Sequence, residues 1–340
     1  MEFLPTLWFI LIAVLWIGYL FLEGFDLGVG MLMKFWARNE SQRRQLLNTI
    51  GPVWDGNEVW LLTAGGATFA AFPYWYASLF AALYIPLTIA LLALILRAVS
   101  IEYRSKSLTQ RGRDMWDWAM AAGSAVAAFC VGAMLALTTT GLPLDANGDR
   151  VGGPFVWLNG YAILGGLAVV GFALIQAWAF LGLKTDGPSR VTANEQLRKL
   201  MPLYIAPLAV WAIIVIVANG NKLWAWAALA VAVAALLGSW SAAAKKREGW
   251  SFIFLGLFLA AGAASIFTSV YPVVLPSTID AAYNLTIDNA ASSSYTLTVM
   301  AWVAAIAVPI VLAYQAWTYK VFANRISEHH IPDHHEVVPL

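Results

Sequence analysis

Acidic side chains stand inside long apolar stretches in the first part of this sequence. Glu23 and Asp26 lie in the first stretch, and Asp55 and Glu58 lie in the second. The two members of each pair are three residues apart, so in a helix both lie on one face. Burial and neighbouring charges adjust the proton affinity of a carboxylate, which makes such a group able to load and release protons. Asp26 and Asp55 are expected to lie deepest, and their glycine neighbours favour a functional role.

A second set of charged residues follows near the boundaries of the next two apolar stretches. Arg97 and Glu102 end the third stretch, and Asp114 and Asp117 begin the fourth. Each ionisable group costs several kcal/mol inside a membrane, so it needs either a partner or a function. One interpretation is a proton route on the inner side with Arg97 as the charge partner. The alternative is that these residues cap helices, reach the interface or pair with Arg97.

The elements that position these residues are predicted to be membrane-spanning helices. The chain is 61% hydrophobic and 11% charged, whereas soluble domains carry roughly 25% charged residues. About 20 apolar residues cross the hydrocarbon core as a helix. Candidate spans are 4–33, 50–73, 75–100, 115–141, 157–183, 200–218, 223–243, 250–275 and 295–322. These stretches are apolar on all sides rather than alternating, which excludes a β-barrel.

The basic residues predict how the chain is oriented. With the N-terminus outside, 18 of the 20 Lys and Arg residues fall in cytoplasmic segments, and only Arg150 and Lys222 fall outside. This is the charge bias that sets orientation during insertion. We therefore predict a multi-pass membrane protein with its C-terminus in the cytoplasm, and the loop 184–199 on that same side.

The predicted fold class is an all-α integral membrane protein of about nine transmembrane helices, arranged as two four-helix bundles plus one helix. The acidic cluster belongs to the first bundle, because the later spans carry almost no charge. The predicted units are 1–141 (first bundle), 142–275 (second bundle), 276–326 (the ninth helix and its preceding loop) and 327–340 (a disordered cytoplasmic tail).

Histidine is confined to the end of the chain. All four histidines, His329, His330, His334 and His335, follow the last apolar stretch. A haem in a membrane bundle is usually held by histidine from the helices, or by histidine and methionine. We therefore expect this chain alone to bind no haem, and we assign no metal site to it.

Several specific motifs occur along the chain. The most specific are Glu23 to Gly30 (EGFDLGVG) and Trp54 to Asn57 (WDGN) continuing to Ala71. Further pieces are Tyr103 to Lys106, Met115 to Trp118, Tyr271-Pro272, Pro276-Ser277 and Trp302 to Trp317. Together and in this order, these motifs resemble one known family, subunit II of the bacterial cytochrome bd-type quinol oxidase. The part between the fifth and eighth spans matches only loosely, so no quinone or accessory contact is carried over to it.

The resemblance implies a function that composition cannot show. It implies a heterodimer with subunit I, which would ligate haem b and haem d, oxidise quinol and reduce dioxygen to water with cytoplasmic protons. A small single-helix accessory subunit, lipids and quinone are further partners that the family suggests. Asp55 and Glu102 match positions on a proton route along the subunit interface, with Asp26 nearby and Glu23 and Glu58 in the same acidic cluster.

Three functions remain as hypotheses from the sequence. The first is an oxidase subunit that gives protons and oxygen access to haem d, for which the resemblance places Trp60 near the mouth of an oxygen channel. The second is a proton-coupled transporter, although the acids here lie in one half of the chain and near one leaflet, whereas transporter sites usually lie at the midplane between repeats. The third is a subunit that only stabilises subunit I.

Overall fold

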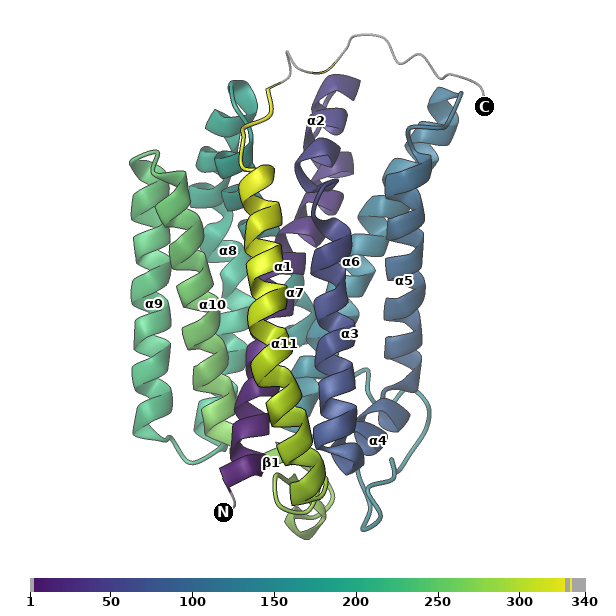
Figure 1. Ribbon diagram of the computed structural model, residues 1–340, viewed down its shortest axis with the longest axis vertical. Helices are drawn as coiled ribbons and strands as arrows, with labels where there is room; N and C mark the ends of the chain where they lie inside the picture. Colours follow the sequence, from purple (N-terminus) through teal and green to yellow (C-terminus); the bar gives the residue numbers. More distant parts are fainter. Residues whose placement is uncertain (1–2, 328–330, 332–340) are drawn as a thin grey trace.

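A computed structural model describes residues 3–327 and residue 331. The elements are, in chain order, α1 (Phe3–Phe35), α2 (Glu40–Ile50), α3 (Trp54–Ala71), α4 (Pro73–Ala82), α5 (Tyr84–Tyr103), α6 (Gln110–Thr140), α7 (Gly160–Lys184), α8 (Pro188–Ala218), α9 (Leu223–Ala244), α10 (Glu248–Val270), β1 (Val273–Leu275), η1 (Ala281–Tyr283), β2 (Leu285–Thr286) and α11 (Ser294–Val321). The long helices run side by side as one bundle (Figure 1). The predicted all-α class is confirmed, with one short antiparallel pair, β1 and β2, at the end that holds the N-terminus.

Eight helices in the described part of the chain are long and apolar enough to cross a membrane: α1, α5, α6, α7, α8, α9, α10 and α11. The predicted second span, 50–73, corresponds to α3, which has 18 residues and carries Asp55 and Glu58 near its start. α3 packs against α1 and runs along the bundle (Figure 1). The multi-pass membrane fold is thus confirmed, while the number of nine crossings stays a prediction.

The predicted third span, 75–100, was wrong as a single helix. The structure breaks it at Leu83, where the backbone leaves helical geometry between α4 and α5. Pro86, near the start of α5, has no N–H to donate to the carbonyl four residues earlier. That carbonyl, on Ala82, instead accepts a hydrogen bond from Arg150 Nη1 at 3.1 Å. The break is therefore stabilised by a side chain from a loop far along the sequence.

A short helix that the sequence analysis did not predict, α2, lies between α1 and α3. Asn39 caps its N-terminus by accepting a hydrogen bond from the backbone N–H of Gln42 at 2.8 Å. Side-chain caps of this kind satisfy one of the free N–H groups that begin every helix. α2 stands at the end of the bundle opposite the N-terminus (Figure 1). It is polar on one side and packs on the bundle through buried residues such as Leu46.

α1 occupies a central position because its glycines allow close approach. A Cβ atom on Gly28 would lie 2.1 Å from the carbonyl oxygen of Ala173 on α7, and one on Gly30 would lie 2.3 Å from Ser124 Oγ on α6. Small residues let membrane helices pack backbone to backbone in this way. As a result, every residue of α1 from Glu23 to Met33 is buried, including its two carboxylates.

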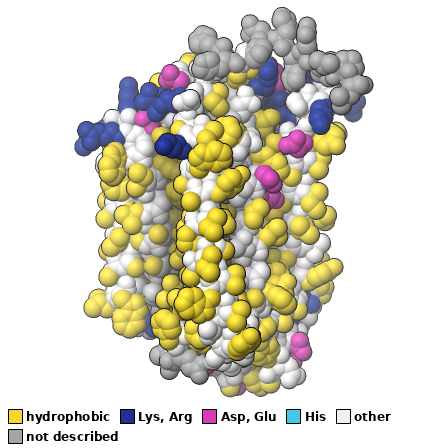
Figure 2. Space-filling view, in the orientation of Figure 1, with side chains coloured by type: hydrophobic (Ala, Val, Ile, Leu, Met, Phe, Trp, Pro, Cys, Tyr) yellow, Lys and Arg dark blue, Asp and Glu magenta, His cyan; other side chains and the backbone are white. Residues whose placement is uncertain are grey.

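The two ends of the bundle differ in charge. Figure 2 shows Lys and Arg side chains gathered at the end that carries α2 and the last turns of α11. The middle of the visible face is apolar, as a surface in contact with lipid requires. The positions of Lys and Arg in the loops predict such a gathering of basic residues at one end. That this end faces the cytoplasm stays a prediction.

α11 is the least buried of the long helices. Leu297 is its only buried residue, and the Trp8 indole N–H donates to the Leu297 carbonyl at 3.0 Å, which fixes one end of α11. Most of its other side chains, including Trp302 and Tyr314, are exposed in the described chain. α11 therefore presents a long apolar surface that the rest of the chain does not cover.

The other end of α11 is fixed by residues 322–326, here called the C-terminal hook. Arg325 Nη1 donates at 2.8 Å to two backbone carbonyls at the end of α7, and the Lys184 ammonium donates back to carbonyls of the hook. The carbonyl of Ile326 accepts from the Gln45 side chain on α2 at 2.8 Å. Of the predicted disordered tail, 327–340, only Ser327 and Ile331 are described, and the four histidines lie outside the described residues. The division of the chain into two four-helix units stays a prediction.

Candidate functional site

Three of the charged residues singled out in the sequence meet in the interior. Arg97 on α5 lies with its Nη1 atom 2.9 Å from Glu23 Oε1 on α1 and 3.5 Å from Glu58 Oε2 on α3. The side chains of Arg97 and Glu23 are fully buried, whereas that of Glu58 is 22% exposed. We call these three residues the charge cluster. Arg97 therefore pairs with one acid of α1 and one acid of α3.

The packing of α6 on α5 explains why Arg97 is buried so completely. A Cβ atom on Gly123 would lie 2.6 Å from the carbonyl oxygen of Ala93 and 3.2 Å from the backbone nitrogen of Arg97. The missing side chain lets α6 close over α5 at this level. A charge taken fully out of water is costly unless it is paired. Glu23 and Glu58 supply that pairing.

Asp26, one turn from Glu23, is held by the polar part of α3. Its Oδ2 atom accepts a hydrogen bond from Asn57 Nδ2 at 2.6 Å, and both residues are buried. Asn57 Nδ2 also donates to the carbonyl of Leu22 at 3.3 Å. Asn57 therefore joins α3 to the same turn of α1 that carries the acids.

α11 completes this polar network from the other side. The side-chain amide oxygen of Asn57, Oδ1, accepts from Tyr319 OH at 2.8 Å and from Gln315 Nε2 at 3.3 Å. Gln315 Oε1 in turn accepts from the indole N–H of Trp60 at 2.9 Å. We call Asn57, Trp60, Gln315 and Tyr319 the amide clamp. Trp60 is seated by α1, since a Cβ atom on Gly18 would lie 2.3 Å from the Trp60 ring.

Several buried polar atoms near these groups lack a hydrogen-bond partner in the described protein. They are Asp26 Oδ1, Glu23 Oε2, the Nε and Nη2 atoms of Arg97, and the hydroxyl of Tyr19, while Glu23 Oε1 makes only its ion pair with Arg97. Buried polar atoms that are not bonded to protein usually bond to internal water. The carboxyl groups of Glu23 and Asp26 therefore keep free oxygens through which a proton can be exchanged.

Asp55 and Glu102 are placed differently from the buried acids. Asp55 is the second residue of α3 and is exposed in the described chain, unlike the buried Asp26, and its depth in the membrane stays a prediction. It lines a groove of about 600 Å³ between α3 and α11, together with Trp60 and Tyr319. Glu102 lies at the end of α5 and is also exposed; in the described chain no ion pair or hydrogen bond connects it to the charge cluster.

A second group of ion pairs lies at the basic end. Arg104 donates to both carboxylate oxygens of Glu40, at 2.9 and 2.8 Å, and its Nε lies 2.5 Å from Asp117 Oδ1. Burial opposes ionisation of Glu40, but the hydrogen bonds from Arg104 outweigh it, so the pKa of Glu40 lies below its ordinary value. Asp114 pairs with Lys34 at 3.6 Å. Asp114 and Asp117 thus both pair with basic side chains, though not with Arg97.

The sequence analysis missed the residues that organise Asp26. Asn57 stood inside a recognised motif but was given no role, and Gln315 and Tyr319 were not considered at all. Their contacts join positions more than 250 residues apart along the chain. The only signal was that Gln315 and Tyr319 lie one turn apart in the last helix and so share one face.

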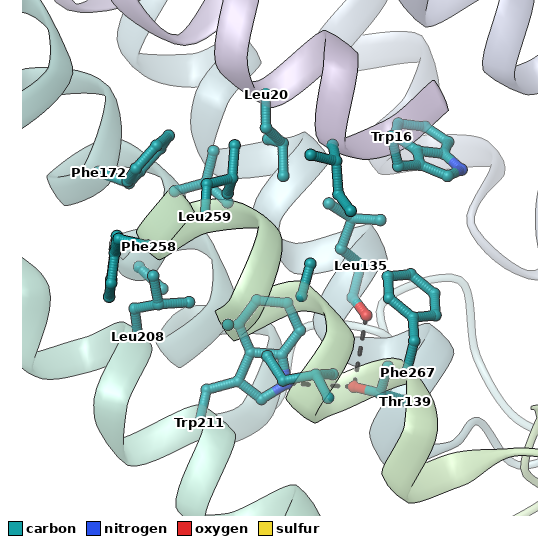
Figure 3. Close-up of a pocket in the computed structure, with 16 residues that line it drawn as sticks. Trp16, Leu20, Leu135, Thr139, Phe172, Leu208, Trp211, Phe258, Leu259 and Phe267 are labelled. Carbon is teal, nitrogen blue, oxygen red and sulfur yellow. Dashed lines mark hydrogen bonds between the residues drawn. The ribbon is translucent and has the colours of Figure 1, made fainter. Parts of the chain in front are cut away.

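The bundle also contains an apolar cavity of about 50 Å³ (Figure 3). Figure 3 shows Trp16 and Leu20 on α1 facing Leu208 and Phe258 across it. The Thr139 hydroxyl at its wall accepts a hydrogen bond from the Trp211 indole at 3.1 Å. None of the predicted acids lines the cavity. In the described residues no group of three or more His, Cys, Asp or Glu is placed to hold a metal ion.

Comparison with known proteins gives consistent matches over the whole chain. Residues 4–322 match the family described as cytochrome bd terminal oxidase subunit II. The chain is 40% identical to cytochrome bd ubiquinol oxidase subunit 2 of Bacillus subtilis (strain 168), over 96% of this chain and 98% of that protein. It is 35% identical to cytochrome bd-I ubiquinol oxidase subunit 2 of Escherichia coli (strain K12), over 97% of each chain.

The fold has a counterpart among solved structures. A chain in the structure of bd oxidase from Geobacillus thermodenitrificans superimposes with a TM-score of 0.78 at 18% sequence identity. The match covers 94% of the present chain and 99% of the other. At this identity the match shows that the two chains share a fold.

Proposed function

The chain belongs to the cytochrome bd terminal oxidase subunit II family, and from this premise we propose that its buried acids deliver protons toward the oxygen-reducing centre. It is a subunit of a quinol:oxygen oxidoreductase in a bacterial plasma membrane. Reduction of dioxygen to water consumes protons, so such an enzyme needs groups that bring them into the membrane. The buried carboxyl groups of Glu23 and Asp26, with their free oxygens, carry this proposal.

The haem groups are assigned to the partner, subunit I. A cytochrome carries haem, and haem iron in a bundle is usually held by histidine. The helices of this chain contain no histidine, because all four occur at 329–335. The residues present therefore do not fit an axial ligand set, and the chemistry at haem b and haem d, including quinol oxidation, is not routed through this chain.

The partner-facing surface is proposed to include α3, α5 and α11. α11 is almost uncovered, and Asp55 and Glu102 lie exposed on α3 and α5. Placing an ionised carboxylate in contact with lipid costs free energy, so a face that combines exposed acids with uncovered apolar helices is better covered by another protein. Asp55 and Glu102 would then take protons at the subunit boundary and pass them to the charge cluster and Asp26.

Oxygen access is proposed along the groove between α3 and α11. The groove is lined by apolar residues such as Val59 and Val311 and by the Trp60 ring, and dioxygen dissolves well in apolar surroundings. Trp60 stands at its wall and is held in one orientation by Gln315 and Gly18. This position supports the role that the sequence resemblance implies for Trp60.

The proton proposal is tested by Asp55→Asn in the purified complex. The change keeps the size of the side chain and removes its proton, so turnover per haem d should fall by about 10-fold or more. Haem content should stay normal. The matched control is Asp288→Asn, the same substitution at an exposed position in the loop between β2 and α11. It should leave turnover unaltered.

Two outcomes would contradict the proposal. An unchanged rate per haem d in Asp55→Asn would remove Asp55 from the proton route. A loss of haem content at a normal rate per haem d would instead support the third hypothesis, a subunit that only stabilises its partner. The transporter hypothesis is set aside because the chain belongs to the oxidase family.

A further inference from the structure

The side chain of Asn57 uses its entire hydrogen-bonding capacity. An asparagine amide has two N–H donors and one oxygen with two lone pairs. Both donors are used, toward Asp26 Oδ2 at 2.6 Å and the Leu22 carbonyl at 3.3 Å. Both lone pairs are used as well, by Tyr319 at 2.8 Å and Gln315 at 3.3 Å. This set of partners favours the present orientation, since turning the amide over would set its oxygen against the Leu22 carbonyl and the Asp26 carboxylate.

The four partners of Asn57 come from two different sides. Leu22 and Asp26 belong to the rigid, closely packed part of α1, while Gln315 and Tyr319 belong to α11. α11 is otherwise loosely packed, and the groove beside it separates it from α3. A shift of α11 would consequently release the oxygen of Asn57 before it disturbed the packing of α1.

We propose that Asn57 is a positioning residue that couples α11 to Asp26. With Tyr319 and Gln315 on its oxygen, its amide nitrogen stays on Oδ2 of Asp26, and Oδ1 is left as the oxygen that takes up and gives off the proton. This inference rests on the proposed role of Asp26 in proton delivery. It adds that the last helix, on the face assigned to the partner, determines whether Asp26 presents that oxygen.

The direction of the coupling follows from the geometry. When the two α11 partners leave, only the contacts of its nitrogen with Asp26 and Leu22 still hold the amide of Asn57, and an amide that turns over sets its oxygen against the Asp26 carboxyl group. That contact suits only the protonated carboxyl, because an ionised one would meet a second acceptor. The proton would then be retained on Asp26, and its transfer onward would slow.

The test is Tyr319→Phe in the intact complex, which removes one hydroxyl from the clamp and nothing else. Turnover per haem d should fall about 3- to 10-fold, as expected for loss of one well-formed buried hydrogen bond. Tyr295→Phe, the same change in an exposed residue at the other end of α11, is the matched control and should have no effect. Haem content and yield of the complex are measured for both variants.

The decisive comparison is made in an Asp26→Asn background. If Tyr319 acts through Asp26, Tyr319→Phe should cause no further slowing there. Slowing by the same factor in both backgrounds would overturn the inference, since Tyr319 would then act elsewhere. A normal rate for Tyr319→Phe alone would overturn it as well.

A second measurement separates this inference from the proposed function. The Asp26 carboxyl band, identified in infrared spectra by its loss in Asp26→Asn, should shift in Tyr319→Phe and not in Tyr295→Phe. If Asp26→Asn leaves turnover normal, the proton role of Asp26 fails, but a shifted band still supports the positioning by Asn57. An unshifted band would overturn the positioning whatever the turnover.

Discussion

Arg97→Gln offers a direct test of the charge cluster. The change removes the only cation within ion-pair distance of Glu23 in the described chain and leaves a buried acid without compensation. Glutamine keeps part of the side-chain volume and two N–H donors, so the loss is chiefly one of charge. The substitution should therefore destabilise the folded chain strongly.

The magnitude follows from the burial of the two partners. Breaking a buried ion pair from one side typically costs about 3–5 kcal/mol. The pair of Arg97 with Glu23, at 2.9 Å and with both side chains fully buried, belongs to that class. The contact with Glu58 is longer, at 3.5 Å, and that side chain is partly exposed, so it adds little. We expect a loss of about 3 kcal/mol, near the lower end of the range.

The assay is the thermal unfolding of the purified complex, with the yield of haem per assembled complex recorded in parallel. The double variant Glu23→Gln with Arg97→Gln removes both charges and should recover most of the loss, because two neutral amides cost less to bury than one carboxylate. Arg38→Gln, at an exposed position, is the control and should change stability by less than about 0.5 kcal/mol. Wild-type stability in Arg97→Gln, or a double variant no better than the single one, would refute the reasoning.

Two further predictions concern the packing and the basic end. Gly28→Ala should lower the yield of folded chain, by a cost of about 1–3 kcal/mol or more, because its Cβ would meet the Ala173 carbonyl, whereas Gly249→Ala, with open space around it, should be neutral in the same expression assay. Glu40→Gln should speed amide hydrogen exchange in α2 at pH 7. Since the pKa of Glu40 is lowered, its stabilising contribution is present above its unfolded-state pKa and is lost as the pH falls through the folded value. The difference from wild type should therefore shrink at acid pH, and a difference that persists there would contradict the ion-pair explanation.

The sequence predicted which charged residues would lie near one another, because helix periodicity and alternating direction bring Glu23 and Arg97 to one level. It could not predict which acid of the second pair would meet Arg97. Asp55 and Glu58 lie on the same side of α3, and the choice between them depends on the residue at which the helix begins. Because α3 begins at Trp54, Asp55 falls in its first turn and is exposed, while Glu58 reaches Arg97.

Other features were missed for reasons that differ from one another. The break at Leu83 had a local signal in Pro86, and α2 had one in its capping residue Asn39, so both were within reach of sequence reasoning. The contacts of Gln315 and Tyr319 had only the spacing of these two polar residues one turn apart, because the contacts depend on how α11 lies against α3. Such contacts follow from the packing of whole helices and cannot be deduced from spacing along the chain.

The C-terminal hook has a consequence for the order in which the molecule is made. Arg325 and Ile326 bind groups on α7 and α2 that were synthesised at least 140 residues earlier. The chain must therefore be synthesised through residue 326 before this end of α11 can make its contacts with α7 and α2. Until then the end of α11 near Gln315 and Tyr319 lacks its contacts with α7 and α2. A chain truncated before the hook would keep all of its described membrane helices and yet lack these contacts to α7 and α2.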